Sequence, residues 1–139
     1  MKTILIVDDD ESYLELLRLL LIQEGYRVLT AADGPQGIAV YQEHHPDLVF
    51  LDLSLPSMNG IQVLREIRHI DSKAKIIVIT GFGSVESAVT AMQSGAVDFV
   101  EKVDSSENVD FVEKVDFVTN FQEVTSKKIK NVLDEFGGD

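Results

Sequence analysis

The sequence predicts an α/β fold in which a parallel sheet is covered by helices on both faces. Short apolar runs rich in β-branched residues alternate with helix-like segments over the first hundred residues or so. Runs such as Ile4–Val7 and Leu48–Leu51 are apolar throughout, as in strands buried on both faces. Both runs end in aspartate, at the strand end where open α/β sheets bind their ligands. We therefore expect repeated βαβ units with right-handed crossovers and a site at one edge.

Apolar periodicity and helix-capping residues locate the elements of the first half. Thr3–Val7 is the first expected strand, and Ser12–Glu24 is a helix with leucines on one face. Gly25 closes this helix, because glycine readily adopts the left-handed conformation of a C-cap. Tyr26–Ala31 is the second strand. Asp33 is a suitable N-cap for the next helix, which is expected from Pro35 to His44, with its proline in the first turn.

The second half of the sheet repeats the alternation. The remaining strands are expected at Asp47–Leu51, Lys75–Ile79 and Val97–Val100. The helices between them are expected at Gly60–His69 and Ser84–Ser94. Thr80 and Lys102 then lie just beyond the last two strands, on the edge that carries the aspartates.

Composition excludes several classes of protein. The chain has 139 residues, 45% of them hydrophobic, and no cysteine, so disulfides and thiolate metal sites are excluded. A formal net charge of −12 argues against direct binding to nucleic acid by this chain. The apolar run at the N-terminus is too short for a signal peptide or a membrane span. We expect a cytoplasmic protein with no membrane contact.

Four aspartates predict a metal site at the sheet edge. Asp8, Asp9 and Asp10 follow the first strand, and Asp52 follows the third. Crowded carboxylates repel one another unless a cation is present or one of them is protonated, and a hard divalent ion with oxygen ligands, Mg²⁺ above all, removes that repulsion. We expect Asp8, Asp9 and Asp52 to hold Mg²⁺, with the backbone carbonyl near Ser54, while Asp10 caps the first helix.

The same edge could support phosphoryl transfer. Asp52 is the candidate nucleophile, because a carboxylate can accept a phosphoryl group as an aspartyl phosphate. Lys102 would pair with Asp52 and then with a phosphoryl oxygen, and the Thr80 hydroxyl would donate to the same oxygens. Taken singly, each has a plainer interpretation: an aspartate that caps a helix, a threonine at a strand end, and a solvated lysine. Their convergence on one edge favours the shared site.

These residues resemble the receiver domain of the two-component response-regulator family over residues 1 to about 104. The motifs that carry the resemblance are Ile6–Glu11, Asp52 with Pro56 and Gly60, Thr80-Gly81 and Gly95–Lys102. The resemblance implies a flavodoxin-like sheet of order 2-1-3-4-5. It also implies that Asp52 receives its phosphoryl group from a sensor histidine kinase or a histidine phosphotransfer protein, with Mg²⁺ as cofactor. The chain looks most similar to receivers of the enhancer-binding, nitrogen-regulatory type of activator.

The resemblance further implies a switch. In receivers, a hydroxyl matched by Thr80 moves toward the phosphoryl group, and an aromatic matched by Phe99 turns inward. This remodels the face made by the fourth helix, the fifth strand and the fifth helix, as a two-state equilibrium biased by a local charge. Plain core packing is the alternative interpretation of Phe99.

Two features depart from the family pattern. Val103 stands where receivers nearly always have a proline after a cis bond; a cis bond here would cost about 3 kcal/mol, so we expect a trans bond and a different loop, which bears on the reach of Lys102. The segment Asp98–Val103 also recurs as Asp110–Val115. A local duplication is the plainer interpretation of the repeat. The alternatives are that Lys114 competes with Lys102 or that the second copy offers another fifth strand; the site is assigned to Lys102 because the first copy follows Gly95.

The C-terminal part is expected to be helical. We divide the chain into a receiver core over 1–104 and a region over 105–139 that holds the fifth helix and an extension, with a break near Thr125. If the second half extends beyond the domain, its apolar stripe favours a homodimer, the alternative being a tail that folds back on its own domain. The stripe consists of Ile129, Val132, Leu133 and Phe136.

The sequence therefore predicts a phosphorylation-dependent signalling switch and not a metabolic enzyme. One alternative is a degenerate receiver that acts only as a protein-binding or dimerisation module. The other is a Mg²⁺-dependent phosphohydrolase with an aspartate nucleophile. Haloacid-dehalogenase-like hydrolases of that kind carry a second acid two residues after the nucleophile, where this chain has Ser54.

Overall fold

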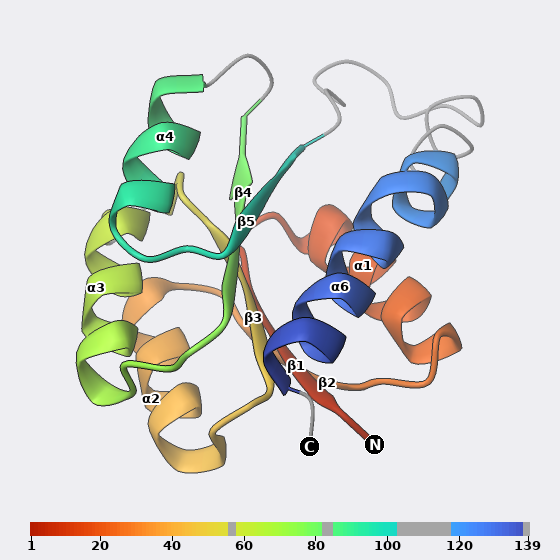
Figure 1. The fold of residues 1–139 in the computed structure, drawn as a ribbon, viewed down its shortest axis with the longest axis horizontal. Coiled ribbons are helices and arrows are strands. Elements are labelled where there is room, and N and C mark those ends of the chain that lie inside the picture. Colours follow the sequence, from red (N-terminus) through yellow and green to blue (C-terminus); the bar gives the residue numbers. More distant parts are fainter. Residues whose placement is uncertain (56–57, 82–84, 103–117, 138–139) are drawn as a thin grey trace.

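One parallel sheet forms the centre of the molecule. The computed structural model describes residues 1–55, 58–81, 85–102 and 118–137. The strands are β1 (Thr3–Val7), β2 (Arg27–Ala31), β3 (Leu48–Asp52), β4 (Ile76–Thr80) and β5 (Asp98–Glu101). They pair in the order β2-β1-β3-β4-β5, all parallel (Figure 1). The expected sheet order is thus confirmed, and β3 runs one residue further than expected, to Asp52 itself.

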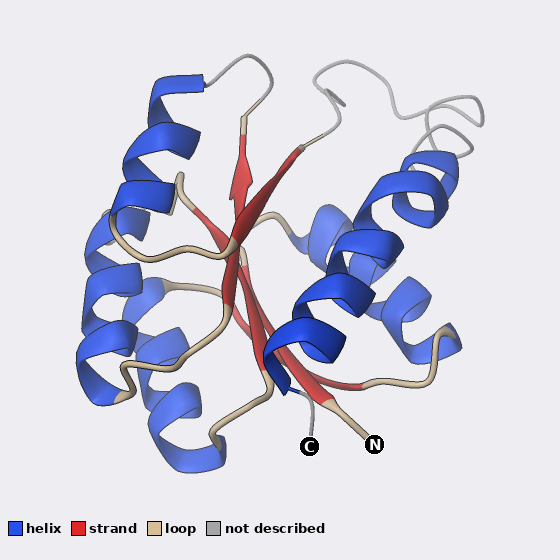
Figure 2. Cartoon of the chain, viewed as in Figure 1, coloured by secondary structure: helices blue, strands red, loops and turns tan. Residues whose placement is uncertain are grey.

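Helices cover both faces of the sheet (Figures 1 and 2). They are α1 (Glu11–Gln23), α2 (Gly34–His44), α3 (Gly60–Ile70), α4 (Val85–Gln93) and α6 (Ser126–Gly137), the last preceded by a π-helical turn at Phe121–Thr125. The helices α2, α3 and α4 lie on one face, and α1 and α6 lie on the other. None of the helices in the described part of the chain is long and apolar enough to cross a bilayer.

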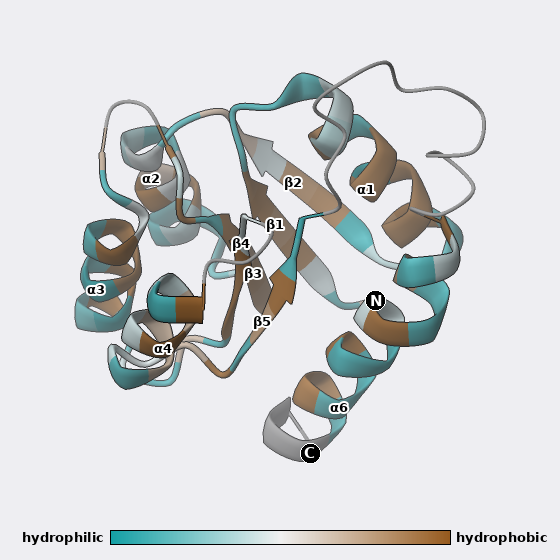
Figure 3. Cartoon of the chain, turned by 90° about the horizontal axis from the view of Figure 1, so that it is seen from above, coloured by the Kyte–Doolittle hydropathy of each residue, from teal (hydrophilic) through white to brown (hydrophobic). Residues whose placement is uncertain are grey.

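Alternation along the strands separates two cores. In β1, Leu5 and Val7 pack with the helices α2 to α4, whereas Ile4 and Ile6 pack with α1 and α6. Successive side chains of a strand point to opposite faces, so a strand that is apolar throughout serves both cores. Figure 3 shows the result: apolar residues line the sheet, and the polar helix faces turn outward.

The expected helix-capping residues act as predicted. The side chain of Asp10 accepts hydrogen bonds from the backbone N–H groups of Ser12 and Tyr13, which caps α1. Asp33 caps α2 in the same way. Gly25, which follows α1, has a φ of +96°, a left-handed value that glycine tolerates without strain.

The C-terminal helix corrects the expectation of an exposed stripe. Ile129, Val132 and Leu133 are only 0%, 4% and 6% exposed and join the core on the α1 side of the sheet. The sheet needs a second helix beside α1 to cover this face, and α6 is the described helix that does so. The homodimer expected through this stripe therefore loses its basis in these three residues. The break expected near Thr125 is not present: Ser126 has helical backbone angles, and the π-helical turn continues directly into α6.

Several expectations concern residues outside those described. The bond after Lys102, the helix expected from about residue 105, and the second copy of the repeat with Lys114 all lie in 103–117. The side chain of Phe136 is also outside the described set. The division of the chain at residue 104 stays a prediction.

Candidate functional site

Four strand ends bring the predicted site residues to one edge of the sheet. Asp8 follows β1, and its backbone N–H donates to the carbonyl of Ala31 at 3.0 Å. Asp52 and Thr80 are the last residues of β3 and β4. Lys102 follows β5, and its backbone N–H donates to the carbonyl of Thr80 at 2.7 Å. Backbone pairing thus fixes where all four side chains begin.

Three carboxylates form a compact cluster at this edge. Asp8, Asp9 and Asp52 each offer an oxygen, and these oxygens lie within 4.8 Å of one another. Asp8 and Asp52 are buried, whereas Asp9 is exposed. The cluster therefore opens to solvent on the side of Asp9, and its oxygens are the ligand type that Mg²⁺ prefers.

A backbone N–H orients each buried carboxylate. The N–H of Asp10 donates to Oδ1 of Asp8, and the N–H of Ser54 donates to Oδ1 of Asp52, both at 2.9 Å. Oδ1 of Asp52 thus accepts a backbone hydrogen bond, whereas Oδ2 of Asp52 lies next to Lys102. The backbone of Ser54 lies beside the site, but the assignment of its carbonyl as a metal ligand stays a prediction.

Lys102 reaches the cluster despite the unusual residue that follows it. Its Nζ lies 3.0 Å from Oδ2 of Asp8, 3.5 Å from Oδ2 of Asp52 and 3.8 Å from Oδ2 of Asp10. Burial alone would lower the pKa of Lys102, but the carboxylates of Asp8 and Asp52 outweigh it and raise that pKa. The expected pair between Lys102 and Asp52 is thus present, and Asp8 lies still closer to the lysine.

The carboxylates of the cluster outnumber the ammonium group of Lys102 that lies near them. Burial raises the pKa of Asp8 to about 7; the N–H of Asp10 opposes the rise, and the carboxylate of Asp52 adds to it. Oδ2 of Asp8 accepts no hydrogen bond from the described residues, although Lys102 lies close by. Near neutral pH, a carboxyl group with this pKa is partly protonated. A divalent cation would replace the proton and offset the repulsion of the three carboxylates, so these residues fit Mg²⁺.

Gly60 fixes the loop after Asp52. A Cβ built on Gly60 would lie 2.4 Å from Cα of Leu53 and 2.9 Å from the carbonyl oxygen of Asp52. No side chain fits that gap without moving the backbone. The start of α3 therefore packs directly on the residue that follows the candidate nucleophile.

Thr80 and Phe99 lie on the side of the site toward α4. The Thr80 hydroxyl is buried and donates to the carbonyl of Val100 at 3.5 Å, a long hydrogen bond. A cavity of about 230 Å³ is lined by Thr80 and Phe99 together with apolar residues of α4. Phe99 and Thr80 therefore border one cavity on the α4 side of the site.

Sequence analysis missed two residues near the site. The ring of Tyr13 lies 4.5 Å from Nζ of Lys102, within the range of a cation–π contact. Its place in the first turn of α1, just after the aspartates, was the signal that could have revealed it. Lys128 of α6 contacts Asp98 and Phe99. Nothing local in the sequence marks Lys128, because its partners lie far away along the chain.

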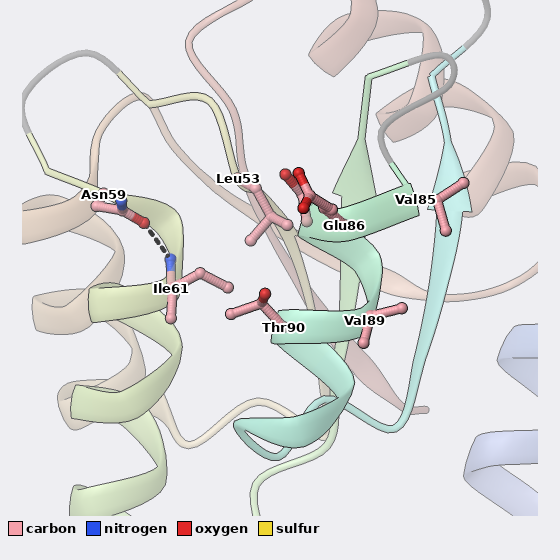
Figure 4. A pocket seen from close by; sticks show the side chains of 8 residues that line it. Leu53, Asn59, Ile61, Val85, Glu86, Val89 and Thr90 are labelled. Carbon is pink, nitrogen blue, oxygen red and sulfur yellow. Dashed lines mark hydrogen bonds between the residues drawn. The ribbon is translucent and has the colours of Figure 1, made fainter.

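A separate groove lies between α3 and α4 (Figure 4). Leu53, Ile61 and Val89 supply apolar side chains, and Glu86 lies at one end. None of the residues predicted for the site is among the described residues that line the groove. The chemistry expected from the sequence is thus concentrated at the acidic cluster.

The comparison with protein families gives one match. The response regulator receiver domain matches residues 4–113. The chemotaxis protein CheY of Bacillus subtilis is 40% identical over 100 residues, which are 71% of this chain and 83% of that protein. The transcriptional regulatory protein GlrR of Escherichia coli is also 40% identical, over 71% of this chain but only 22% of that protein. The chain thus spans most of one relative and a fraction of the other.

Solved structures show the same architecture. A CheY-like receiver domain protein from Methanospirillum hungatei superposes with a TM-score of 0.70 at 30% identity, covering 94% of this chain and 98% of that one. The receiver domain of NtrX from Brucella abortus gives a TM-score of 0.70 at 31% identity, covering 87% and 98%. The similarity therefore extends through the sheet and its helices.

Proposed function

The chain belongs to the response regulator receiver family, and on that premise we propose that Asp52 accepts a phosphoryl group from a phosphohistidine of a sensor histidine kinase or a histidine phosphotransfer protein. Proteins of this family are signalling receivers that work with histidine kinases. One observation carries the proposal: a buried carboxylate, Asp52, lies within 4.8 Å of two further aspartates and 3.5 Å from a lysine ammonium.

The geometry around Asp52 suits nucleophilic attack by one oxygen. The backbone N–H of Ser54 donates a hydrogen bond to Oδ1 of Asp52. Oδ2 of Asp52 is therefore the oxygen that would bond to phosphorus as the phosphorus–nitrogen bond of the donor breaks. The electron pair of that bond returns to the donor imidazole. Lys102, already 3.5 Å from Oδ2, would then bind a phosphoryl oxygen.

Asp8, Asp9 and Asp52 would hold Mg²⁺, together with the backbone carbonyl near Ser54. Receivers generally use this ion, and when bound it supplies positive charge against the phosphoryl oxygens. The exposed carboxylate of Asp9 gives the ion access from solvent. The elevated pKa of Asp8 means that a proton leaves this carboxyl when the ion binds near neutral pH.

Phosphorylation would be transmitted through Thr80 and Phe99. If the Thr80 hydroxyl turns to a phosphoryl oxygen, its long bond to the carbonyl of Val100 is lost, while the backbone pairing of β4 with β5 remains. Phe99 then moves into the cavity beside α4. We expect the change at the face made by the fourth helix, the fifth strand and the fifth helix, and this face would contact the output partner.

The test is intact mass spectrometry after incubation with acetyl phosphate and Mg²⁺. We expect a gain of one phosphoryl group that disappears with EDTA and in Asp52→Asn. Asp47→Asn is the matched control, because Asp47 precedes the same strand at the opposite edge of the sheet, where it accepts a hydrogen bond from Thr3. This control should still gain the phosphoryl group.

Other results would support the alternatives. A folded chain that gains no phosphoryl group would contradict the proposal and indicate a degenerate receiver that only binds proteins. Rapid turnover of many phosphate esters would instead indicate a phosphohydrolase.

A further inference from the structure

Lys128 contacts two consecutive residues of the edge strand β5. Its Nζ lies 3.4 Å from Oδ1 of Asp98, donates a hydrogen bond to the carbonyl oxygen of Phe99, and lies 4.8 Å from the centre of the Phe99 ring. One ammonium group thus binds the side chain of Asp98, the backbone of Phe99 and the aromatic ring.

These contacts cross from one face of the sheet to the other. Lys128 belongs to α6, which packs on the α1 side, whereas Phe99 packs with the apolar cluster on the α4 side. Because β5 ends the sheet in the described residues, Lys128 can reach round its edge (Figure 1). Lys128 therefore contacts Phe99 from the α6 side, whereas the cavity into which the ring would move lies toward α4.

We propose that Lys128 is a positioning residue that holds Phe99 in its present place and so sets the equilibrium which phosphorylation of Asp52 must shift. This inference rests on the proposed function, since the position of Phe99 matters for signalling only if Asp52 is phosphorylated. Inward rotation of the Phe99 ring breaks the cation–π contact, whereas the hydrogen bond to the backbone carbonyl of Phe99 keeps the ammonium group beside β5. Lys128 thereby stabilises the form that has not been phosphorylated.

The proposal predicts faster phosphorylation when the lysine is removed. If the inward form accepts the phosphoryl group better, the observed rate scales with the fraction of molecules in that form. Lys128→Met keeps the length of the side chain and removes the charge and the donor. We expect it to raise the initial rate with acetyl phosphate and Mg²⁺ roughly three- to tenfold, the range of one charged contact at a partly exposed position.

Two further variants isolate the effect. Lys128→Arg restores charge and donor and should return the rate most of the way to that of the unmodified chain. Lys130→Met removes a mostly exposed lysine of the same helix, whose partner is Glu24 at 4.0 Å, and should leave the rate unchanged. Equal rates for Lys128→Met and Lys130→Met would overturn the proposal.

A second measurement does not depend on phosphorylation. In NMR spectra of the unphosphorylated protein, Lys128→Met should shift the ring signals of Phe99 and the amide signal of Thr80, and Lys130→Met should not. If these signals stay in place, Lys128 does not position the ring. If they move while no variant gains a phosphoryl group, the positioning role stands and the proposed function fails.

Discussion

At the scale of single residues, the balance of charge around Asp8 dominates the site. Asp8 is buried beside Asp52, and among the described residues Lys102 is the cation that lies close to both carboxylates. Burial raises the pKa of Asp8 to about 7, which lies above the ordinary value of 3.8. The site thus resists full ionisation until a cation arrives.

This pKa predicts how stability depends on pH in the absence of metal. A carboxyl group whose pKa is higher in the folded state contributes stability that is complete below its unfolded pKa of 3.8 and is lost as pH rises through about 7. In EDTA, urea denaturation should show that the chain loses about 2 kcal/mol more than Asp8→Asn between pH 5 and pH 8.

The matched control for this experiment is Asp10→Asn. Asparagine still caps a helix, so this variant keeps α1 while changing a neighbouring acid, and its pH profile should follow that of the unmodified chain. A profile for Asp8→Asn that matches the unmodified chain would contradict the elevated pKa of Asp8.

Asp9 predicts the response to metal. Because Asp9 is exposed, Asp9→Asn should leave the stability of the metal-free protein within about 0.5 kcal/mol. Mg²⁺ at a hundred times its dissociation constant should stabilise the unmodified chain by about 2.7 kcal/mol and Asp9→Asn by much less at the same concentration. Thermal unfolding with and without Mg²⁺ measures both, and equal gains in the two proteins would exclude Asp9 as a ligand.

At the scale of elements, two contacts determine how the site is supported. The start of α3 packs on the loop after Asp52 at Gly60, and α6 fills the face beside α1 through Ile129. Neither contact involves a reacting group. Substitutions at Gly60 and Ile129 therefore change the packing of a helix and leave every residue of the acidic cluster in place.

Gly60→Ala should disturb the loop of the nucleophile. The added methyl group would meet backbone atoms of Leu53 and Asp52, so we expect a loss of about 2 kcal/mol and slower phosphorylation by acetyl phosphate. Gly25→Ala is the control: its φ of +96° makes alanine costly by about 1 kcal/mol, but nothing lies within 4 Å of its added Cβ. The control should phosphorylate at the normal rate, and an equally normal rate in Gly60→Ala would argue against the supporting role of this contact.

Ile129→Ala tests the place of α6. A fully buried isoleucine replaced by alanine should cost about 3 kcal/mol in urea denaturation. Val124→Ala, at a position that is 40% exposed, should cost less than about 1 kcal/mol. Similar small losses in both variants would mean that α6 does not cover the sheet in solution.

At the scale of the whole molecule, the sheet order explains why the site forms at all. The strands β1 and β3 are neighbours, as are β3 with β4 and β4 with β5, so their carboxyl ends lie side by side. The net charge of −12 also belongs to this scale, because it argues against direct binding of nucleic acid by the chain. The absence of nucleic-acid binding by this chain stays a prediction, and its relative GlrR, a transcriptional regulatory protein, is several times longer than the matched part.

The sequence by itself determined the elements and the chemistry of the edge. Strands apolar throughout, helix-capping aspartates and glycines at helix ends are local signals, because the backbone interactions that they satisfy lie within a few residues. The members of the Asp cluster could be predicted because Asp8 and Asp9 come after one apolar run and Asp52 ends another, and such runs end at the same edge of a parallel sheet.

Only the tertiary structure decided which distant residues meet. It placed Lys102 nearer to Asp8 than to Asp52, brought Lys128 to Phe99, and buried Ile129, Val132 and Leu133 of α6, for which the sequence left open either another chain or this domain itself. An apolar stripe on a helix predicts that this face of the helix will be buried, but it does not identify the surface that buries it. The covering surface depends on which face of the sheet still lacks a helix, and that is a property of the assembled fold.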